Sequence, residues 1–199
     1  MTDVDLDAVA VPLDWRELFG RDAPTDVEIG SGKGRFLLAL AASRPERNLL
    51  AVERAGAYHK MCCERAAKHG LGNIRLLRTT AEDLLFRLLR PSSVDTLFVL
   101  FPDPWPKKRH HKRRFLQSDN LEVLLRCLRP GGEIRIATDH ADYFQQIQEV
   151  TSRYAGQLEE IEFERPAAAR EGERTGTNYE RKYVQQSRPI YTAAFRKRA

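Results

Sequence analysis

Two polar features follow short apolar runs of the sequence, and together they indicate a site for a ligand that contains a ribose. Residues 28–34 read Glu-Ile-Gly-Ser-Gly-Lys-Gly, and Gly30 and Gly32 are the expected ligand contacts because glycines permit a tight turn and a close approach to the backbone. Glu53 ends the next apolar run, where a carboxylate can accept both hydroxyls of a ribose. A glycine turn alone is a weak signal that would also suit a plain strand-to-helix connection, and the pairing with Glu53 strengthens the case for a binding site.

The same loop argues against a dinucleotide. The dinucleotide fingerprint has a third glycine where Arg35 stands, and it uses that glycine for helix packing and for room beside the pyrophosphate. The carboxylate of Glu28 would repel a pyrophosphate, whereas it suits the ammonium and sulfonium groups of S-adenosylmethionine. The loop therefore favours a methyltransferase.

Residues 101–114 combine a carboxylate with a dense run of cations. They read Phe-Pro-Asp-Pro-Trp-Pro-Lys-Lys-Arg-His-His-Lys-Arg-Arg, so prolines on both sides restrict the backbone around Asp103. Residues 107–114 hold six Lys or Arg, and without them the 33 basic residues fall to 27 against 28 acidic ones. The basic excess is local, which indicates a polyanionic partner at one face, although a charge run alone would also suit a solvated surface. The expected phosphate contacts are Lys108, Arg109, Lys112, Arg113 and Arg114.

Strand-like and helix-like segments alternate along the chain, which predicts an α/β fold with a mostly parallel sheet and helices on both faces. Ligands bind beyond the carboxyl ends of such strands. We expect a single domain over residues 1–199, with an acidic N-terminal extension at 1–25 and a substrate-binding loop at 166–186 that holds at most one helical turn. The predicted strands are 26–30, 48–53, 74–78, 94–101, 133–138, 158–164 and 190–196, and the predicted helices are 35–42, 58–69, 81–89, 121–128 and 141–154.

Composition excludes several classes of protein. With 199 residues, 42 % of them hydrophobic and 31 % charged, the chain can bury a core without disulfides or a structural metal. Cys62, Cys63 and Cys127 form no CxxC pair and have no cluster of histidine ligands, so they predict packing residues, no metal site and a reducing cytoplasmic setting. The acidic N-terminus is unlike a signal peptide, and no apolar run is long enough to span a membrane.

Residues 101–114, together with 28–34 and with Thr-Asn-Tyr-Glu-Arg-Lys-Tyr at 177–183, closely resemble the bacterial tRNA (guanine-N7)-methyltransferase family from about Asp26 onward. The resemblance implies the Rossmann-like class I methyltransferase fold, with seven mostly parallel strands and an antiparallel last strand. It also implies S-adenosylmethionine as the cofactor and, as the substrate, the guanosine at position 46 in the variable loop of tRNA.

The resemblance also implies roles for individual residues. Asp103 would be catalytic, and Thr80 stands where the family often has an acid that contacts adenine. A carboxylate can accept the N1 and N2 hydrogens of guanine together, and Glu180 is the better candidate for this contact, with Asp139 sharing it. The implied cofactor contacts are Glu28, Glu53, Thr80 and Asp103, and the implied substrate contacts are Lys107, Asp139, Thr177, Asn178, Tyr179 and Glu180.

The expected chemistry needs few groups. Guanine N7 carries an in-plane lone pair, so attack on a sulfonium methyl group needs no general base, and Asp103 would favour the positive charge that spreads into the purine. Two alternatives stay open: a related methyltransferase that acts on another RNA or a small molecule, and an RNA-binding protein without activity. Both a monomer and a homodimer are compatible with the sequence.

Overall fold

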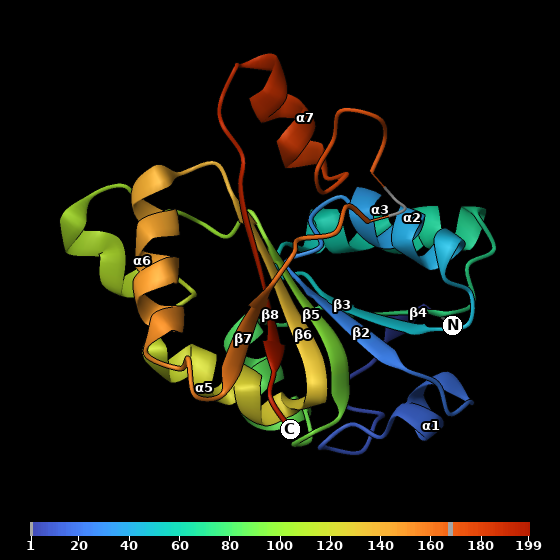
Figure 1. Cartoon of the computed structure of the whole chain (residues 1–199). Helices are drawn as coiled ribbons and strands as arrows, with labels where there is room; N and C mark the ends of the chain where they lie inside the picture. Colours follow the sequence, from blue (N-terminus) through green and yellow to red (C-terminus); the bar gives the residue numbers. More distant parts are fainter. Residues whose placement is uncertain (1, 167–168) are drawn as a thin grey trace.

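The computed structural model describes residues 2–166 and 169–199, and its centre is a sheet of eight strands in the order β1-β4-β3-β2-β5-β6-β8-β7 (Figure 1). Strand β8 is antiparallel to both of its neighbours, and the other pairs are parallel. The strands are β1 (Asp3–Val4), β2 (Thr25–Ile29), β3 (Asn48–Val52), β4 (Ile74–Leu77), β5 (Val94–Leu100), β6 (Leu128–Thr138), β7 (Leu158–Ile161) and β8 (Tyr191–Lys197).

The predicted fold class is confirmed, and the count of seven strands is wrong by one. Each of the seven predicted strands is present, and the additional strand is β1, which pairs Asp3 with Leu76 of β4. Other parts of the predicted N-terminal extension also join the fold. Leu13 is fully buried, and the indole N–H of Trp15 donates a 2.7 Å hydrogen bond to the carbonyl of Ser93. Residues 1, 167 and 168, which the predicted extension and the predicted substrate-binding loop include, lie outside the described residues.

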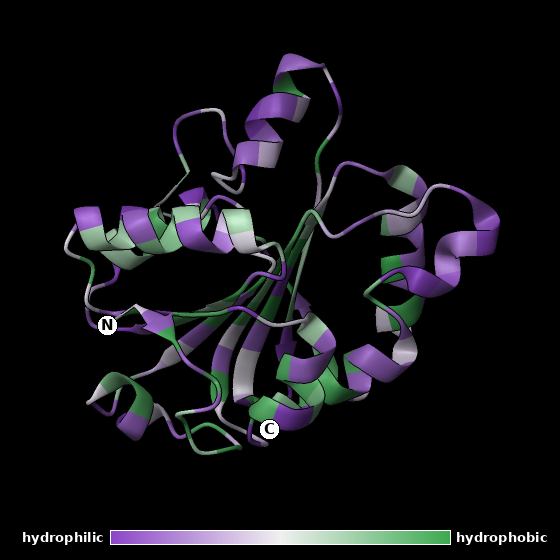
Figure 2. Ribbon diagram, turned by 180° about the vertical axis from the view of Figure 1, so that it is seen from behind, coloured by the Kyte–Doolittle hydropathy of each residue, from purple (hydrophilic) through white to green (hydrophobic). Residues whose placement is uncertain are grey.

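Successive side chains of a strand point to opposite faces of the sheet. Because both faces carry apolar side chains, helices cover both of them. Val27 packs toward α1, α5 and α6, whereas Ala51 and Phe98 pack toward α2 and α3. Figure 2 shows hydrophobic residues concentrated in the strands and on the helices beside them. The helices are α1 (Trp15–Phe19), α2 (Arg35–Ser43), α3 (Gly56–Lys68), α4 (Ala81–Asp83), α5 (Ser118–Cys127), α6 (Ala141–Ser152) and α7 (Asn178–Gln185), with a π-helical turn at Leu84–Leu88 and a 3-10 helix at Lys108–Arg113.

Helix α7 covers neither face of the sheet. It stands above the edge at which the parallel strands end, and its residues are mostly hydrophilic (Figures 1 and 2). The helix at Asn178–Gln185 has eight residues, so it is longer than the single helical turn predicted for this loop. Within the described residues, no helix combines the length and the apolar character that crossing a membrane requires.

The strand order reverses around β2, which has β3 on one side and β5 on the other. A crevice outside the carboxyl ends of the strands is the usual ligand site at such a switch point. The glycine loop, Glu53 and Asp103 follow these three neighbouring strands directly. The topology thus brings the residues selected from the sequence to one place.

Candidate active site

The glycine loop wraps around the carboxylate of Glu53. Glu53 accepts hydrogen bonds from the backbone N–H groups of Gly32 and Ala55, both at 2.8 Å. Gly32 has a positive φ of 54°, a backbone conformation that residues with a Cβ atom rarely adopt. Gly34 meets a second requirement, because a Cβ there would collide with Cys62 of α3. The loop needs its glycines for shape, and Glu53 fixes that shape.

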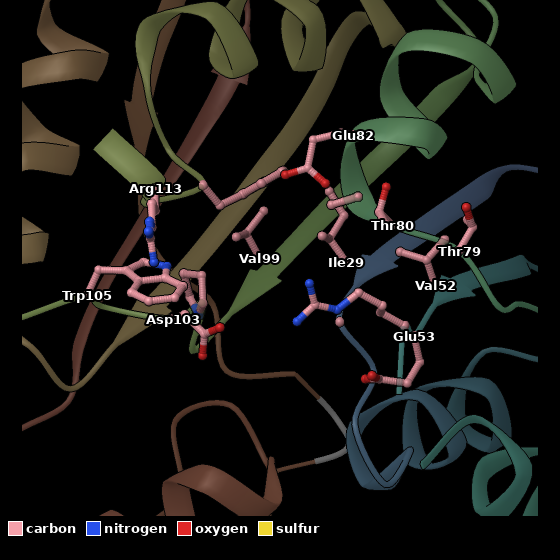
Figure 3. Close-up of a pocket in the computed structure, with 15 residues that line it drawn as sticks. Ile29, Val52, Glu53, Thr79, Thr80, Glu82, Val99, Asp103, Trp105 and Arg113 are labelled. Carbon is pink, nitrogen blue, oxygen red and sulfur yellow. The ribbon is translucent and has the colours of Figure 1, made fainter. Parts of the chain in front are cut away.

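The main pocket lies at the carboxyl ends of β2, β3, β4 and β5 (Figure 3). Glu53 and Thr80 lie on one side of it, and Asp103 and Trp105 lie on the other, with apolar strand residues between them. Five residues chosen from the sequence line it: Gly30, Glu53, Thr80, Asp103 and Arg113. Sequence reasoning missed Glu82, whose carboxylate also lines this pocket.

Thr80 has a structural role in addition to its predicted contact with adenine. Its hydroxyl accepts a 3.1 Å hydrogen bond from the backbone N–H of Asp83 and so caps α4. A hydroxyl oxygen has a second lone pair, so the predicted contact with an adenine amino group is compatible with this cap.

Glu28 occupies a separate crevice between the glycine loop and the start of α7. Its side chain is almost fully buried, and its Oε2 atom has no hydrogen-bond partner among the described residues. Burial, and to a lesser degree the negative charge of Glu53, raise the pKa of Glu28 to about 8. A buried carboxyl group without a partner is suited to a cationic ligand that supplies the missing charge.

We expect Glu28 to make the stability of the ligand-free protein depend on pH. Between its ordinary pKa of 4.5 and about 8, the native state keeps a proton that the unfolded state has released. The free energy of unfolding should therefore fall as pH rises through this interval, by on the order of 5 kcal/mol in total, and Glu28→Gln should flatten the decline. Urea unfolding at pH 5, 7 and 9 measures both slopes. Identical slopes would contradict the raised pKa.

The loop that carries Asp103 has a strained backbone. Phe101 and Trp105 both have positive φ values, 55° and 44°, which are rare for bulky residues and concentrate at functional sites. Asp103 lies between them, is exposed and faces the main pocket (Figure 3). The loop therefore presents a solvated carboxylate at a fixed place beside the pocket.

Arg114 holds this loop, and its burial argues against the predicted phosphate contact. Its side chain is 1 % exposed, donates a 2.8 Å hydrogen bond from Nε to the carbonyl of Pro104 and pairs with Asp142. Its Nη1 atom donates a 2.8 Å hydrogen bond to Gln146. A buried guanidinium with these partners has no surface to offer a phosphate. Asp142 and Gln146 lie 28 and 32 positions after Arg114, so the sequence of residues 107–114 alone does not indicate this role.

The remaining cations of the segment lie on the surface of the 3-10 helix. Lys107, Lys108, Arg109 and Lys112 are exposed, and none of them forms an ion pair within the described part of the chain. Arg113 is placed differently, with its guanidinium carbon 5.1 Å from the centre of the Trp105 ring and its side chain at the pocket. Four unpaired cations thus face solvent next to the loop of Asp103.

Thr177 caps the start of α7, and Glu180 holds the turn that precedes it. The Thr177 hydroxyl accepts the backbone N–H of Glu180 at 3.0 Å. The Glu180 carboxylate is 1 % exposed and accepts the backbone N–H groups of Thr175 and Gly176 at 2.9 and 2.8 Å. This geometry argues against the predicted contact of Glu180 with a guanine edge, because its oxygen atoms hold the preceding turn. The Thr-x-x-Glu spacing was the signal for this cap.

The two residues between Thr177 and Glu180 line the candidate site. Asn178 and Tyr179 line the crevice of Glu28, and the Tyr179 ring is 42 % exposed. A Cβ atom on Gly32 would lie 3.7 Å from this ring, so Tyr179 covers the glycine loop. These two substrate predictions thus fall at the candidate site, whereas Thr177 is buried at the helix cap.

Asp139 and Arg35 attach the C-terminal region to the sheet. Asp139 follows β6, is buried and pairs with Arg188, so a guanine edge would have to displace that guanidinium. Arg35 donates to the carbonyl of Thr177 at 3.0 Å and to the carboxylate of Glu173 at 2.9 Å. Sequence reasoning missed the role of Arg35, which joins α2 to the segment before α7.

One histidine lies beside Cys63. Its Sγ lies 3.9 Å from the His59 ring, one helical turn earlier on α3. Burial raises the pKa of Cys62 to about 12, which fits the predicted packing role.

Comparisons with known proteins agree with this geometry. A family model described as a putative methyltransferase matches residues 22–193. The tRNA (guanine-N(7)-)-methyltransferase of Cupriavidus necator is 38 % identical over 198 residues, which cover 94 % of this chain and 72 % of that protein. The chain belongs to the tRNA (guanine-N(7)-)-methyltransferase family.

Other members of the tRNA (guanine-N(7)-)-methyltransferase family match over a shorter span. The protein of that name from Nitrosomonas eutropha is 44 % identical over 132 residues, which are 66 % of this chain and 59 % of the relative, so the match spans little more than half of that protein. Among solved structures, the 16S rRNA methyltransferase KamB superposes with a TM-score of 0.66 at 19 % identity and covers 93 % of both chains. This last likeness concerns the fold alone.

Proposed function

We propose that this chain transfers the methyl group of S-adenosylmethionine to N7 of a guanosine in tRNA, at position 46 of the variable loop. One observation carries the proposal: the strained loop of Asp103 lies between the strand-end pocket and four unpaired cations. Such a carboxylate can face both a bound cofactor and a base whose phosphates the cations hold.

The residues present fit S-adenosylmethionine. Its sulfonium supplies an electrophilic methyl group when it is bound. Glu53 would accept the ribose hydroxyls with the lone pairs that its two backbone contacts leave, and Thr80 lies at the adenine end of the same pocket. The unpartnered carboxylate of Glu28 would face the cationic amino-acid part.

The protein would act by positioning and electrostatics. Because guanine N7 already has a lone pair, no side chain has to remove a proton before attack. Positive charge develops in the purine as the methyl group arrives, and the Asp103 carboxylate would stabilise that charge without a large reorganisation of the loop. Arg114 contributes by fixing Pro104, the residue next to Asp103.

The tRNA would contact two surfaces. Lys108, Arg109 and Lys112 would bind phosphates, which position the substrate without reading its sequence, and Lys107 would contact the target nucleoside. Asn178 and Tyr179 on α7 would contact the nucleoside from the opposite side of the cleft. A tRNA substrate places the reaction in the cytoplasm. A small-molecule substrate would not need these exposed cations for binding, whereas RNA would. The RNA substrate is therefore favoured.

We expect Glu53→Ala to weaken cofactor binding about 30-fold, which corresponds to about 2 kcal/mol for a lost charge-assisted hydrogen bond. The affinity for tRNA should stay unchanged, because Glu53 lies at the glycine loop and away from the basic helix. Calorimetry with the cofactor and filter binding with tRNA measure the two affinities. Equal cofactor affinity in the variant would place the ribose contact elsewhere.

The proposed reaction is tested by incubating the protein with labelled S-adenosylmethionine and unmodified tRNA, followed by nuclease digestion and mass spectrometry of the nucleosides. We expect the label in 7-methylguanosine. Label in another nucleoside would replace the proposed target, and tRNA that stays unlabelled would favour the small-molecule alternative.

A further inference from the structure

A second group of chemically active side chains lies away from the strand-end cleft. His59 and Cys63 are on α3, and Asp3 is on the edge strand β1. One ligand atom from each residue lies within 4.8 Å of the other two. The Nε2 atom of His59 is 3.3 Å from Oδ1 of Asp3 and 3.9 Å from Sγ of Cys63. No part of the proposed methyl transfer uses this group.

The fold holds two of these side chains in place and leaves access to the third. His59 and Cys63 are four residues apart, so they lie on the same face of α3, a spacing that helical zinc ligands also use. His59 is 5 % exposed, and Cys63 is half-buried. Asp3 comes from the opposite side, held by the pairing of β1 with β4, and its carboxylate is 62 % exposed. An ion could reach the group from solvent past Asp3.

The separations match those around a tetrahedral transition metal. With metal–nitrogen and metal–oxygen bonds of about 2.1 Å and a metal–sulfur bond of about 2.3 Å, tetrahedral angles place nitrogen about 3.4 Å from oxygen and about 3.6 Å from sulfur. The observed distances are 3.3 Å between His59 and Asp3 and 3.9 Å between His59 and Cys63. The Asp3 and Cys63 ligand atoms lie within 4.8 Å of each other, so a movement of the exposed Asp3 side chain would complete the arrangement.

We propose that Asp3, His59 and Cys63 bind one divalent transition-metal ion of the zinc class, with the fourth position open to water. The ligand types decide the class, because a thiolate and an imidazole suit zinc, whereas magnesium and calcium take oxygen ligands. The bound ion joins β1 to α3 and so fastens the edge strand to the helix layer. This inference replaces the sequence-based expectation of no metal site, and it is independent of the proposed methyl transfer.

The proposal is tested by titrating the purified, metal-free full chain with Co²⁺ and then with Zn²⁺. We expect one equivalent of Co²⁺ to produce a thiolate-to-cobalt charge-transfer band, which Zn²⁺ then removes by displacement. Cys63→Ser should abolish the band, and Asp3→Asn and His59→Gln should weaken binding by at least about 100-fold. Asp5→Asn is the matched control, since Asp5 lines the same hollow but is not one of the three ligands.

Thermal unfolding gives a second readout. At a Zn²⁺ concentration about 100-fold above Kd, the melting temperature of the wild type should rise by about 5 to 10 °C, and that of Asp3→Asn should not. Asp3 is exposed, so this variant is expected to fold, which circular dichroism of the metal-free protein checks. Cobalt binding without a sulfur band, or a band that persists in Cys63→Ser, would overturn the proposal and indicate an adventitious surface site.

Discussion

Asp103→Ala is expected to lower single-turnover methyl transfer to tRNA by at least about a hundredfold, the usual cost of losing one preorganised electrostatic group. The expectation rests on the loop, because positive φ values at Phe101 and Trp105 and the bond from Arg114 to Pro104 fix where the carboxylate lies. Asp103 is exposed and has no hydrogen-bond partner among the described residues, so the fold should persist. Rapid-quench measurement with saturating cofactor gives the rate.

Two further variants show whether charge is the cause. Asp103→Asn keeps the size of the side chain and removes its charge, so it should lose most of the same activity. Glu159→Ala removes an exposed acid from β7, far from the cleft, and should retain the wild-type rate. A wild-type rate in Asp103→Ala would exclude Asp103 from the mechanism.

Removing three cations of the 3-10 helix should flatten the salt dependence of tRNA binding. Each phosphate that a cation neutralises contributes about −0.7 to −0.9 to the slope of log affinity against log salt. Replacing Lys108, Arg109 and Lys112 by serine should therefore reduce the magnitude of that slope by about 2 to 3 and weaken different tRNAs to a similar degree. Cofactor affinity should not change. Lys107 stays in place because the family resemblance assigns it to the target nucleoside.

A matched variant separates local contacts from total charge. Serine at Arg16, Lys68 and Arg198 removes the same charge from exposed positions outside the basic segment. This variant should keep a slope close to that of the wild type. An unchanged slope in the helix variant, or equal changes in both variants, would show that the basic segment is a solvated surface and that tRNA is held elsewhere.

The fold could be predicted in detail because its central strands are short, apolar and separated by helical patterns. The strand Val94–Leu100, for example, is buried along almost its whole length and is recognisable by composition alone. Strand β1 gives no such signal. It has two residues, Asp3 and Val4, and it forms only because β4 presents an open edge beside it. Pairing of that kind is a property of the assembled sheet.

The candidate site was predictable where a residue directly follows a strand. Glu53 and Asp103 line the pocket as the sequence indicated. Predictions from residue type were weaker, because Arg114 and Glu180 both carry the expected charge but find partners inside the protein. The partner of Arg114, Asp142, comes from a different helix, and only the packed structure shows that pairing.

The central claim is that the protein methylates N7 of guanosine 46, and one substituted tRNA tests it directly. In 7-deazaguanosine a C–H group replaces N7, so the lone pair is lost while the edge that pairs with other bases is kept. A tRNA with this single substitution at position 46 should bind the protein as tightly as the unmodified tRNA and accept no methyl group from labelled S-adenosylmethionine. Methyl transfer to the substituted tRNA at the rate of the unmodified one would contradict the claim.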